Sequence, residues 1–280
     1  MMENVITSRV NPIVKCVGGL AEKKNRSREE AFRFDGIKLF CEAVTFGADI
    51  RKVIIRVPEK ESITEALARA IASGRLDERC VVRVNDSVFE KLSEEKAPEG
   101  IITVASFMPT LHLRVSGREA ASVLSEYKKL LLLESVRDPG NLGAIMRSCN
   151  ALGIEMLVMS SDCADIYSQK TLRSAMGAVF KQKTLTLPTE EMAEFIKALR
   201  EAGRKVYATA LSEKSVSINS IELGEADCFV IGNEGHGLSA EVIEACDAPV
   251  IIPMAEGAES LNAAVAASLC VWETVRVKEA

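Results

Sequence analysis

Apolar runs and helical segments alternate along the chain from residue 127 onward. Each run is rich in Val, Leu and Ile, and in most cases a segment with apolar residues at helical spacing comes next. The runs are 129–135, 154–160, 205–211, 227–232 and 248–254, and the helical segments are 141–152, 169–179, 190–201, 239–245 and 260–276. Uniformly apolar strands between helices predict an α/β domain over residues 127–280, with a mostly parallel sheet covered on both faces.

The first 108 residues show a smaller version of the same alternation. Helical spacing occurs at 12–32 (interrupted by two glycines), 37–47, 63–74 and 86–93, and strand patterns occur at 51–57, 80–85 and 100–107. This order predicts a small α/β sandwich over residues 1–108, a length that can fold alone. Residues 109–126 lack clear periodicity and are expected to link the two domains.

Composition excludes several classes of protein. The chain has 280 residues with 48% apolar residues, and no window approaches the roughly 18 apolar residues of a membrane span. Eight cysteines without a CxxC pair and only two histidines make a metal site and histidine catalysis poor hypotheses. The first residues lack a signal-peptide pattern, so we expect a cytoplasmic protein with reduced thiols and no membrane partner.

The charge distribution favours one nucleic-acid contact region despite a net charge of −5. Between residues 8 and 28 a single acid, Glu22, accompanies six basic residues, namely Arg9, Lys15, Lys23, Lys24, Arg26 and Arg28. Local potential matters more than total charge for binding phosphates. A solvated helix that contacts nothing explains the same pattern equally well.

Three strand-to-helix junctions carry polar residues beyond what turns need. Asn141 and Arg147 follow the first run, Glu234 lies in the glycine-rich "GNEGHG" that begins at Gly232, and Ser260 and Asn262 follow the last run. Parallel sheets bind ligands at the carboxyl ends of their strands. Since all three junctions belong to that edge, we expect one site there.

Each residue also has a simpler explanation. Asn141 and Ser260 are both suited to be helix N-caps, Arg147 can extend into solvent, and Glu234 can be a solvated loop acid. Asn262, placed just inside a helix that starts at residue 260, would have no capping role and a poor helix propensity. Three such coincidences at one sheet edge are less probable than a site.

Known nucleotide motifs do not account for the junctions. A dinucleotide fold has GxGxxG after its first strand, whereas "GNLG" and "GNEGHG" have the wrong spacing or position. A GxxxxGK[ST] phosphate loop and a Ser-His-Asp order are also missing from the sequence. The residues alone therefore indicate a nucleotide-like small molecule held largely by backbone.

The three junctions resemble a specific family. "NLGAIMRSCNALG", "FVIGNEGHGLS" and "IIPMAEGAESLNAAVAASL" are similar, in order and spacing, to the three motifs of the SpoU (TrmH) family of RNA 2′-O-ribose methyltransferases in the SPOUT superfamily. The resemblance covers roughly residues 128–276, with "YSQKTLRSAMGAVF" as the intermotif helix. "FRFDGIKLFCEAV" is similar to the L30e-like substrate-binding domain of many members.

The resemblance implies a trefoil knot, a homodimer, no metal, and S-adenosylmethionine (SAM) as cofactor. The positions that match the family's cofactor pocket are Thr209, Ala210, Gly232, Ile252, Met254, Leu261 and Asn262. Arg147 matches the catalytic position, surrounded by Asn141, Glu234, Ser260 and Asn262. Arg173 in the intermotif helix and the six basic residues of the 8–28 segment are the candidates for RNA contacts.

The implied reaction is methyl transfer to a ribose 2′-hydroxyl. The extra N-terminal domain favours 23S ribosomal RNA as substrate, with transfer RNA as the alternative. Two other readings stay open: an RNA-binding protein with a degenerate methyltransferase half, which cofactor binding would contradict, and a nucleotide-dependent oxidoreductase, which the glycine spacing disfavours.

Overall fold

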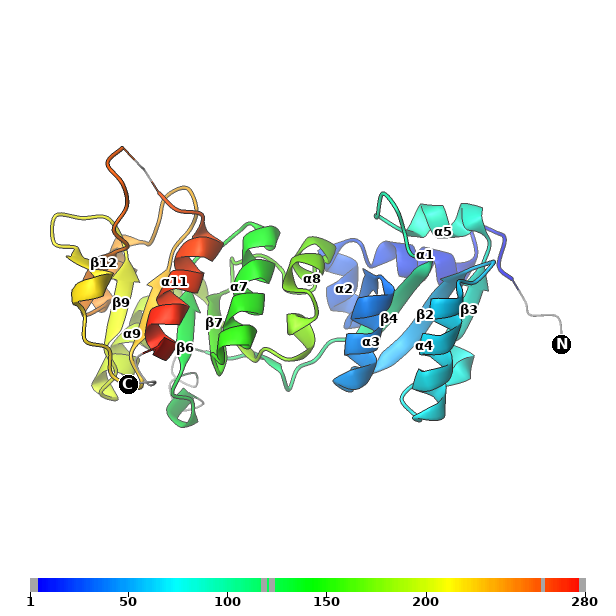
Figure 1. Cartoon of the computed structure of the whole chain (residues 1–280), viewed down its shortest axis with the longest axis horizontal. Coiled ribbons are helices and arrows are strands. Elements are labelled where there is room, and N and C mark those ends of the chain that lie inside the picture. Colours follow the sequence, from blue (N-terminus) through cyan, green and yellow to red (C-terminus); the bar gives the residue numbers. More distant parts are fainter. Residues whose placement is uncertain (1–4, 117–119, 121–123, 258–259, 277–280) are drawn as a thin grey trace. The chain divides into compact units, whose positions relative to one another are not determined.

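The computed structural model describes residues 5–116, 120, 124–257 and 260–276. The chain divides into two compact units (Figure 1). Unit 1 comprises the residues up to Met108 together with Tyr167–Phe180, and unit 2 comprises Pro109–Ile166 and the residues from Lys181 onward. In the described part, no helix is long and apolar enough to cross a membrane.

Unit 1 is a four-stranded sheet between two layers of helices. The strand order is β1 (Ala31–Asp35), β4 (Ile101–Ser106), β2 (Ile50–Arg56), β3 (Val81–Val84). Only the β2–β3 pair is parallel. One apolar cluster joins the sheet to α1 (Pro12–Gly19) and α5 (Asp86–Leu92), and a second joins it to α3 (Ile37–Thr45) and α4 (Glu61–Ala72). Adjacent strand residues enter different clusters, which follows from the alternation of side chains across a strand.

The predicted helix over 12–32, interrupted by two glycines, is confirmed as two helices up to residue 29, but it is wrong for residues 30–32. The chain forms α1 and then α2 (Lys23–Glu29), which Glu30 ends in the left-handed region (φ 47°), and β1 begins at Ala31. The pattern of β1 was obscured by Arg33, which is only 3% exposed. Its guanidinium donates to the Leu92 carbonyl at 2.8 Å and pairs with Glu94 at 2.8 Å, so a charge is accommodated inside an apolar strand.

The segment Tyr167–Phe180, which contains α8 (Gln169–Ala175), belongs to unit 1. The Tyr167 ring stacks on Phe107 with centroids 4.3 Å apart, and its hydroxyl accepts the Met108 N–H at 2.8 Å. Phe180 packs against Phe34 at 5.3 Å. The compact units thus differ from the predicted domains in this segment, because its aromatic rings complete the core of unit 1. The boundaries at 108, 126 and 127 stay predictions.

Unit 2 is an eight-stranded sheet in which every pair is parallel. The strand order is β10 (Val216–Ser217), β12 (Ala248–Ile251), β9 (Val206–Thr209), β11 (Cys228–Ile231), β6 (Leu130–Leu133), β7 (Met156–Ser160), β8 (Thr184–Leu187), β5 (His112–Arg114). The parallel sheet predicted from the apolar runs is confirmed. β5, β8 and β10 were not predicted, since β5 and β10 have only three and two residues and the Thr-Leu-Thr-Leu sequence of β8 is not an apolar run.

Helices cover both faces of this sheet. α9 (Met192–Glu201) and α10 (Ala240–Ala245) share one apolar core with alternate residues of the strands. α7 (Pro139–Leu152) and α11 (Ala263–Arg276) run side by side (Figure 1), joined by the Ser268 hydroxyl, which donates to Ser148 Oγ at 2.8 Å. Short 3₁₀ helices complete the described elements: Glu78–Cys80, Leu124–Glu126, Ala178–Phe180, Thr189–Glu191 and Ile218–Ser220. The knot implied by the resemblance stays a prediction.

Candidate active site

The N-terminus of α7 is capped by Asp138, whose carboxylate accepts the Asn141 backbone N–H at 2.9 Å. Pro139 takes the first helical position, where its missing N–H and fixed φ are favourable. Asn141 is therefore the third residue of the helix, which starts two residues earlier than predicted. The N-cap explanation for Asn141 is wrong, and its side chain is available for other contacts.

Side chains from all three junctions meet in one chain of hydrogen bonds. Asn141 Nδ2 donates to Glu234 Oε1 at 2.9 Å, and Asn262 Nδ2 donates to Asn141 Oδ1 at 2.9 Å. The direction of the chain is fixed, because a carboxylate only accepts and so the Asn141 amide nitrogen must face Glu234. We call Glu234, Asn141 and Asn262 the junction relay.

Asn262 has a capping role after all. The helix α11 begins at Ala263, and Asn262 Oδ1 accepts the N–H groups of Ala264 at 2.9 Å and Val265 at 3.3 Å. The predicted start at residue 260 is wrong by three residues, so the argument that Asn262 cannot cap fails. Both ends of the Asn262 amide are therefore used: the oxygen caps α11, and the nitrogen donates the last hydrogen bond of the junction relay.

Arg147 and Ser260 lie outside the relay. Arg147 is exposed on α7, about 9 Å of helical rise beyond Asn141. Within the described part of the chain its guanidinium makes no ion pair or hydrogen bond, and the same holds for hydrogen bonds of the exposed Ser260 side chain. A guanidinium without such partners in the described residues is available to an anionic ligand, and the catalytic role of Arg147 stays a prediction.

The loop after β11 is a closed turn that requires glycine. Asn233 and Gly237 exchange two backbone hydrogen bonds of 3.0 Å, and Asn233 Oδ1 accepts the Gly235 N–H at 2.8 Å. A Cβ on Gly232 would lie 2.5 Å from the carbonyl carbon of Gly237 and 2.6 Å from the nitrogen of Leu238. Both atoms are backbone, so neither can rotate away.

We therefore expect Gly232→Ala to destabilise the protein by about 1–3 kcal/mol, the usual range for overpacking, and to weaken SAM binding through displacement of the loop. Gly235→Ala is the matched control, since its Cβ would meet only Asn233 Oδ1, at 3.4 Å. Urea unfolding and calorimetric titration with SAM measure the two effects. Equal behaviour of the two variants would contradict the requirement for glycine at position 232.

The residues proposed for the cofactor lie at one edge of unit 2. β12, β9 and β11 are neighbours in the sheet, so Thr209, the last residue of β9, lies at the same edge as Gly232 and Ile252, which directly follow β11 and β12. Thr209 Oγ donates to the Val230 carbonyl at 2.8 Å, and the Ala210 N–H donates to the Val250 carbonyl at 3.2 Å.

Large apolar side chains are exposed on the loops beside this edge. Met254 is 42% exposed and Leu261 37%, and the neighbouring Leu211, which sequence reasoning missed, is 84% exposed. Apolar side chains left in solvent beside a glycine turn fit a ligand with an aromatic ring such as adenine. The residues present therefore suit SAM. In the described part of the chain, no three His, Cys, Asp or Glu side chains group to hold a metal ion.

The basic residues proposed for RNA contacts divide into three groups, namely one buried arginine, exposed lysines and arginines with partners. Arg26 is removed from the set, because it is only 5% exposed and donates to the carbonyls of Leu20 at 2.9 Å and Ala21 at 2.6 Å. It holds the turn between α1 and α2. Exposed side chains include Lys15, Lys23 and Lys24.

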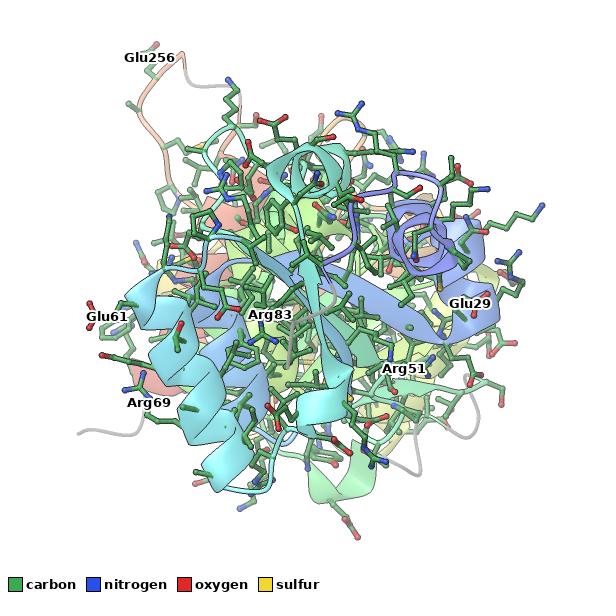
Figure 2. All side chains as sticks on the ribbon, turned by 90° about the vertical axis from the view of Figure 1, so that its right-hand side faces the viewer. Glu29, Arg51, Glu61, Arg69, Arg83 and Glu256 are labelled. Carbon is green, nitrogen blue, oxygen red and sulfur yellow. The ribbon has the colours of Figure 1, made fainter. Side chains whose placement is uncertain are left out.

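Three arginines have partners but remain accessible. Arg28 pairs with Glu29 at 3.0 Å, and Arg9 donates to Ser87 Oγ at 3.1 Å. Arg173 pairs with Glu95 at 2.9 Å while its side chain stays 43% exposed. Figure 2 shows two other charged side chains of the same unit, Glu61 and Arg69, which both point outward from α4.

Comparison with known proteins matches both parts of the chain. Residues 128–272 match the SpoU rRNA methylase family, and residues 11–103 match the MRM3-like substrate-binding domain. The 23S rRNA (guanosine(2553)-2′-O)-methyltransferase RlmP of Bacillus subtilis is 30% identical over 267 residues, which cover 95% of this chain and 97% of that protein.

Solved structures agree with this assignment. The AdoMet-bound rRNA methyltransferase from Sinorhizobium meliloti is 29% identical, covers 99% of both chains and has a TM-score of 0.81. The SpoU methyltransferase AviRb from Streptomyces viridochromogenes, in complex with AdoMet, is 26% identical, covers 95% of this chain and 97% of its own, and has a TM-score of 0.78. The sequence, the fold and the three joined junctions lead to one conclusion, that the chain belongs to the SpoU rRNA methylase family.

Proposed function

We propose that this protein transfers the methyl group of SAM to a ribose 2′-hydroxyl of 23S ribosomal RNA. The observation that carries the proposal is the junction relay, which joins Glu234, Asn141 and Asn262 from three motifs. Curated relatives such as RlmP act on 23S rRNA. A degenerate methyltransferase half would not need these three side chains to be hydrogen-bonded to one another.

SAM supplies a methyl group already activated on a sulfonium, so the methyl–sulfur bond breaks with its electron pair as the methyl–oxygen bond forms. The protein then contributes mainly position. Asn262 and Glu234 hold Asn141, and through it the N-terminus of α7, against the loops beside the cofactor edge. Glu234 is committed to Asn141 and acts in positioning.

Arg147 acts on the RNA in this proposal. A guanidinium stays protonated in proteins and is unsuited to be a general base. Its charge and bidentate geometry suit the phosphate beside the target ribose, bring the 2′-hydroxyl into line, and stabilise the developing alkoxide. The hydroxyl proton leaves to water or to that phosphate.

The test is methyl transfer from labelled SAM to unmodified ribosomal RNA and to transfer RNA, followed by nucleoside mass analysis. We expect a 2′-O-methylated nucleoside from ribosomal RNA. The same product from transfer RNA alone would contradict the substrate. SAM binding without transfer to either pool would point to an assembled ribosomal particle as substrate, and no binding would contradict the function.

The exposed lysines of unit 1 are proposed to bind RNA phosphates. Replacing Lys23 and Lys24 with alanine should weaken RNA binding and reduce the slope of log Kobs against log salt by about 1.4–1.8, because each lost phosphate contact contributes roughly 0.7–0.9. Lys197→Ala, in α9 and paired with Glu194 at 2.6 Å, is the control and should leave the slope unchanged. Filter binding at several salt concentrations measures it.

A second copy of the chain is the proposed partner of α11. Val265, Leu269 and Trp272 are 48%, 40% and 51% exposed, and their spacing places them on one face of the helix. An apolar stripe of this kind is typical of an interface. Light scattering in solution is expected to give twice the 30.4 kDa mass of the chain.

A further inference from the structure

One carboxylate outside the three motifs gathers four hydrogen bonds at the carboxyl edge of unit 2. Asp162 Oδ2 accepts from Ser135 Oγ at 2.6 Å and from Arg137 Nη2 at 2.9 Å. Its Oδ1 accepts from Ser160 Oγ at 2.7 Å and from Thr189 Oγ at 2.9 Å. Burial opposes the charge, but these four donors together hold the pKa of Asp162 below its usual range. The group is therefore a carboxylate at neutral pH.

The residue that Asp162 holds most closely, Ser135, has an unusual backbone. Its φ is 56°, in the left-handed region that few residues other than glycine adopt. The Ser135 N–H donates to Ser160 Oγ at 2.8 Å, and its carbonyl accepts from Asn233 Nδ2 at 2.7 Å. Strained backbone persists only where surrounding contacts determine it. Here those contacts are Asp162 and its neighbours.

The turn at residues 134–137 therefore connects the first two junctions, which follow β6 and β11. On one side it leads directly into α7. On the other, Asn233 belongs to the closed loop after β11, and the buried Glu134 accepts the N–H and the hydroxyl of Ser239 at 2.8 and 2.6 Å, at the start of α10. A displacement of this turn would move α7 and the β11 loop relative to each other.

We propose that Asp162 is a positioning residue for methyl transfer. By fixing the turn 134–137 it sets the direction in which α7 presents Asn141 and Arg147, and through Ser135 and Asn233 it sets the loop that carries Glu234. This inference rests on the proposed function. Asp162 touches neither substrate nor cofactor in this scheme, and acts only through the turn.

A second carboxylate provides the matched control. Asp227 precedes β11 at the opposite edge of the sheet and is 6% exposed. Its carboxylate accepts the backbone N–H groups of Lys205 at 3.0 Å and Gly224 at 2.7 Å. Both residues are hydrogen-bonded carboxylates of unit 2, but only Asp162 contacts the turn that connects the junctions.

The experiment compares Asp162→Asn and Asp227→Asn at saturating SAM and RNA. An amide has one acceptor atom where a carboxylate has two, so the two pairs of donors around Asp162 cannot both be served. We expect kcat to fall at least tenfold in Asp162→Asn, with KM for RNA and Kd for SAM within threefold of wild type. Asp227→Asn should unfold at lower urea concentration and keep kcat within twofold.

One further variant keeps the test decisive if Asp162→Asn does not fold, and a second tests the proposed contact if it does. Arg137, 61% exposed, can be replaced by leucine with little loss of packing, and kcat should again fall with KM unchanged. Ser135→Ala combined with Asp162→Asn should lose no more rate than Asp162→Asn alone. Both substitutions disrupt the same contact, the hydrogen bond from Ser135 Oγ to Asp162, so their effects should not add. Unchanged kcat in Arg137→Leu, additive losses in the double variant, or parallel losses of kcat and stability in both Asp variants would overturn the inference. Absence of transfer by the wild-type protein would instead overturn the proposed function itself.

Discussion

Replacing Arg147 with alanine is expected to lower the rate constant of methyl transfer by about 10²–10³-fold, the usual effect of removing one group that stabilises developing charge. The free energy of unfolding should change by less than about 0.5 kcal/mol, as is usual for surface substitutions. The physical reason is the absence of any ion pair or hydrogen bond of the guanidinium within the described residues, so its removal leaves no group of the protein unpaired.

Arg147→Lys separates charge from geometry. Lysine keeps the positive charge but lacks the planar fork that contacts two phosphate oxygens at once. We expect a loss close to that of alanine, measured by single-turnover transfer at saturating RNA. A small loss, with a pH–rate profile identical to that of wild type, would show that bidentate geometry is unimportant.

The matched control is Arg69, an exposed arginine of α4 whose guanidinium also makes no ion pair or hydrogen bond within the described residues and points outward in Figure 2. Arg69→Ala removes the same side chain from a helix of unit 1. Its transfer rate at saturating RNA should equal that of wild type. A loss similar to that of Arg147→Ala would indicate a general effect of surface charge on RNA binding.

The parallel sheet and the meeting of the three junctions could be predicted because both follow from patterns that extend over much of the chain. Uniformly apolar strands between helices leave few architectures, and the carboxyl ends of parallel strands meet at one edge. Asn141, Glu234 and Asn262 therefore came together as expected from three distant junctions. The family resemblance added the reaction and the cofactor, which periodicity does not contain.

What could not be predicted depends on contacts that only the folded chain creates. Helix starts were placed at Asn141 and Ser260, although Asp138 and Asn262 are the caps, because Asn, Asp and Ser are all good caps and several stood nearby. Arg26 was proposed for RNA contacts, and Arg33 interrupts the apolar pattern of β1, but carbonyl groups at helix ends hold both side chains inside unit 1. Asp162 belongs to none of the three motifs, and only the folded chain brings four hydrogen-bond donors to its carboxylate.

Replacing Asn141 with alanine is expected to lower transfer about 10²-fold, since misplacing reacting groups by about 1 Å has effects of this size. Stability should fall by less than about 1 kcal/mol, because Asp138 caps α7 and the relay bonds are exposed enough for water to replace them. The control is Asn85→Ala, which removes the cap of α5 that accepts the Val88 N–H at 3.1 Å. It should lose about 1 kcal/mol of stability and no transfer.

The direction of the junction relay allows a stronger test with two isosteric substitutions. Asn141→Asp places a carboxylate oxygen against Glu234, where two acceptors and two negative charges repel, so transfer should fall at least as far as in Asn141→Ala. Adding Glu234→Gln restores a donor facing that carboxylate, with the hydrogen bond reversed and the Asn262 amide still donating to the other oxygen. We therefore expect the double variant to regain at least tenfold in rate over Asn141→Asp alone. If the two losses simply multiply, the hydrogen bond between positions 141 and 234 contributes nothing to transfer, and the relay is only a feature of the folded chain.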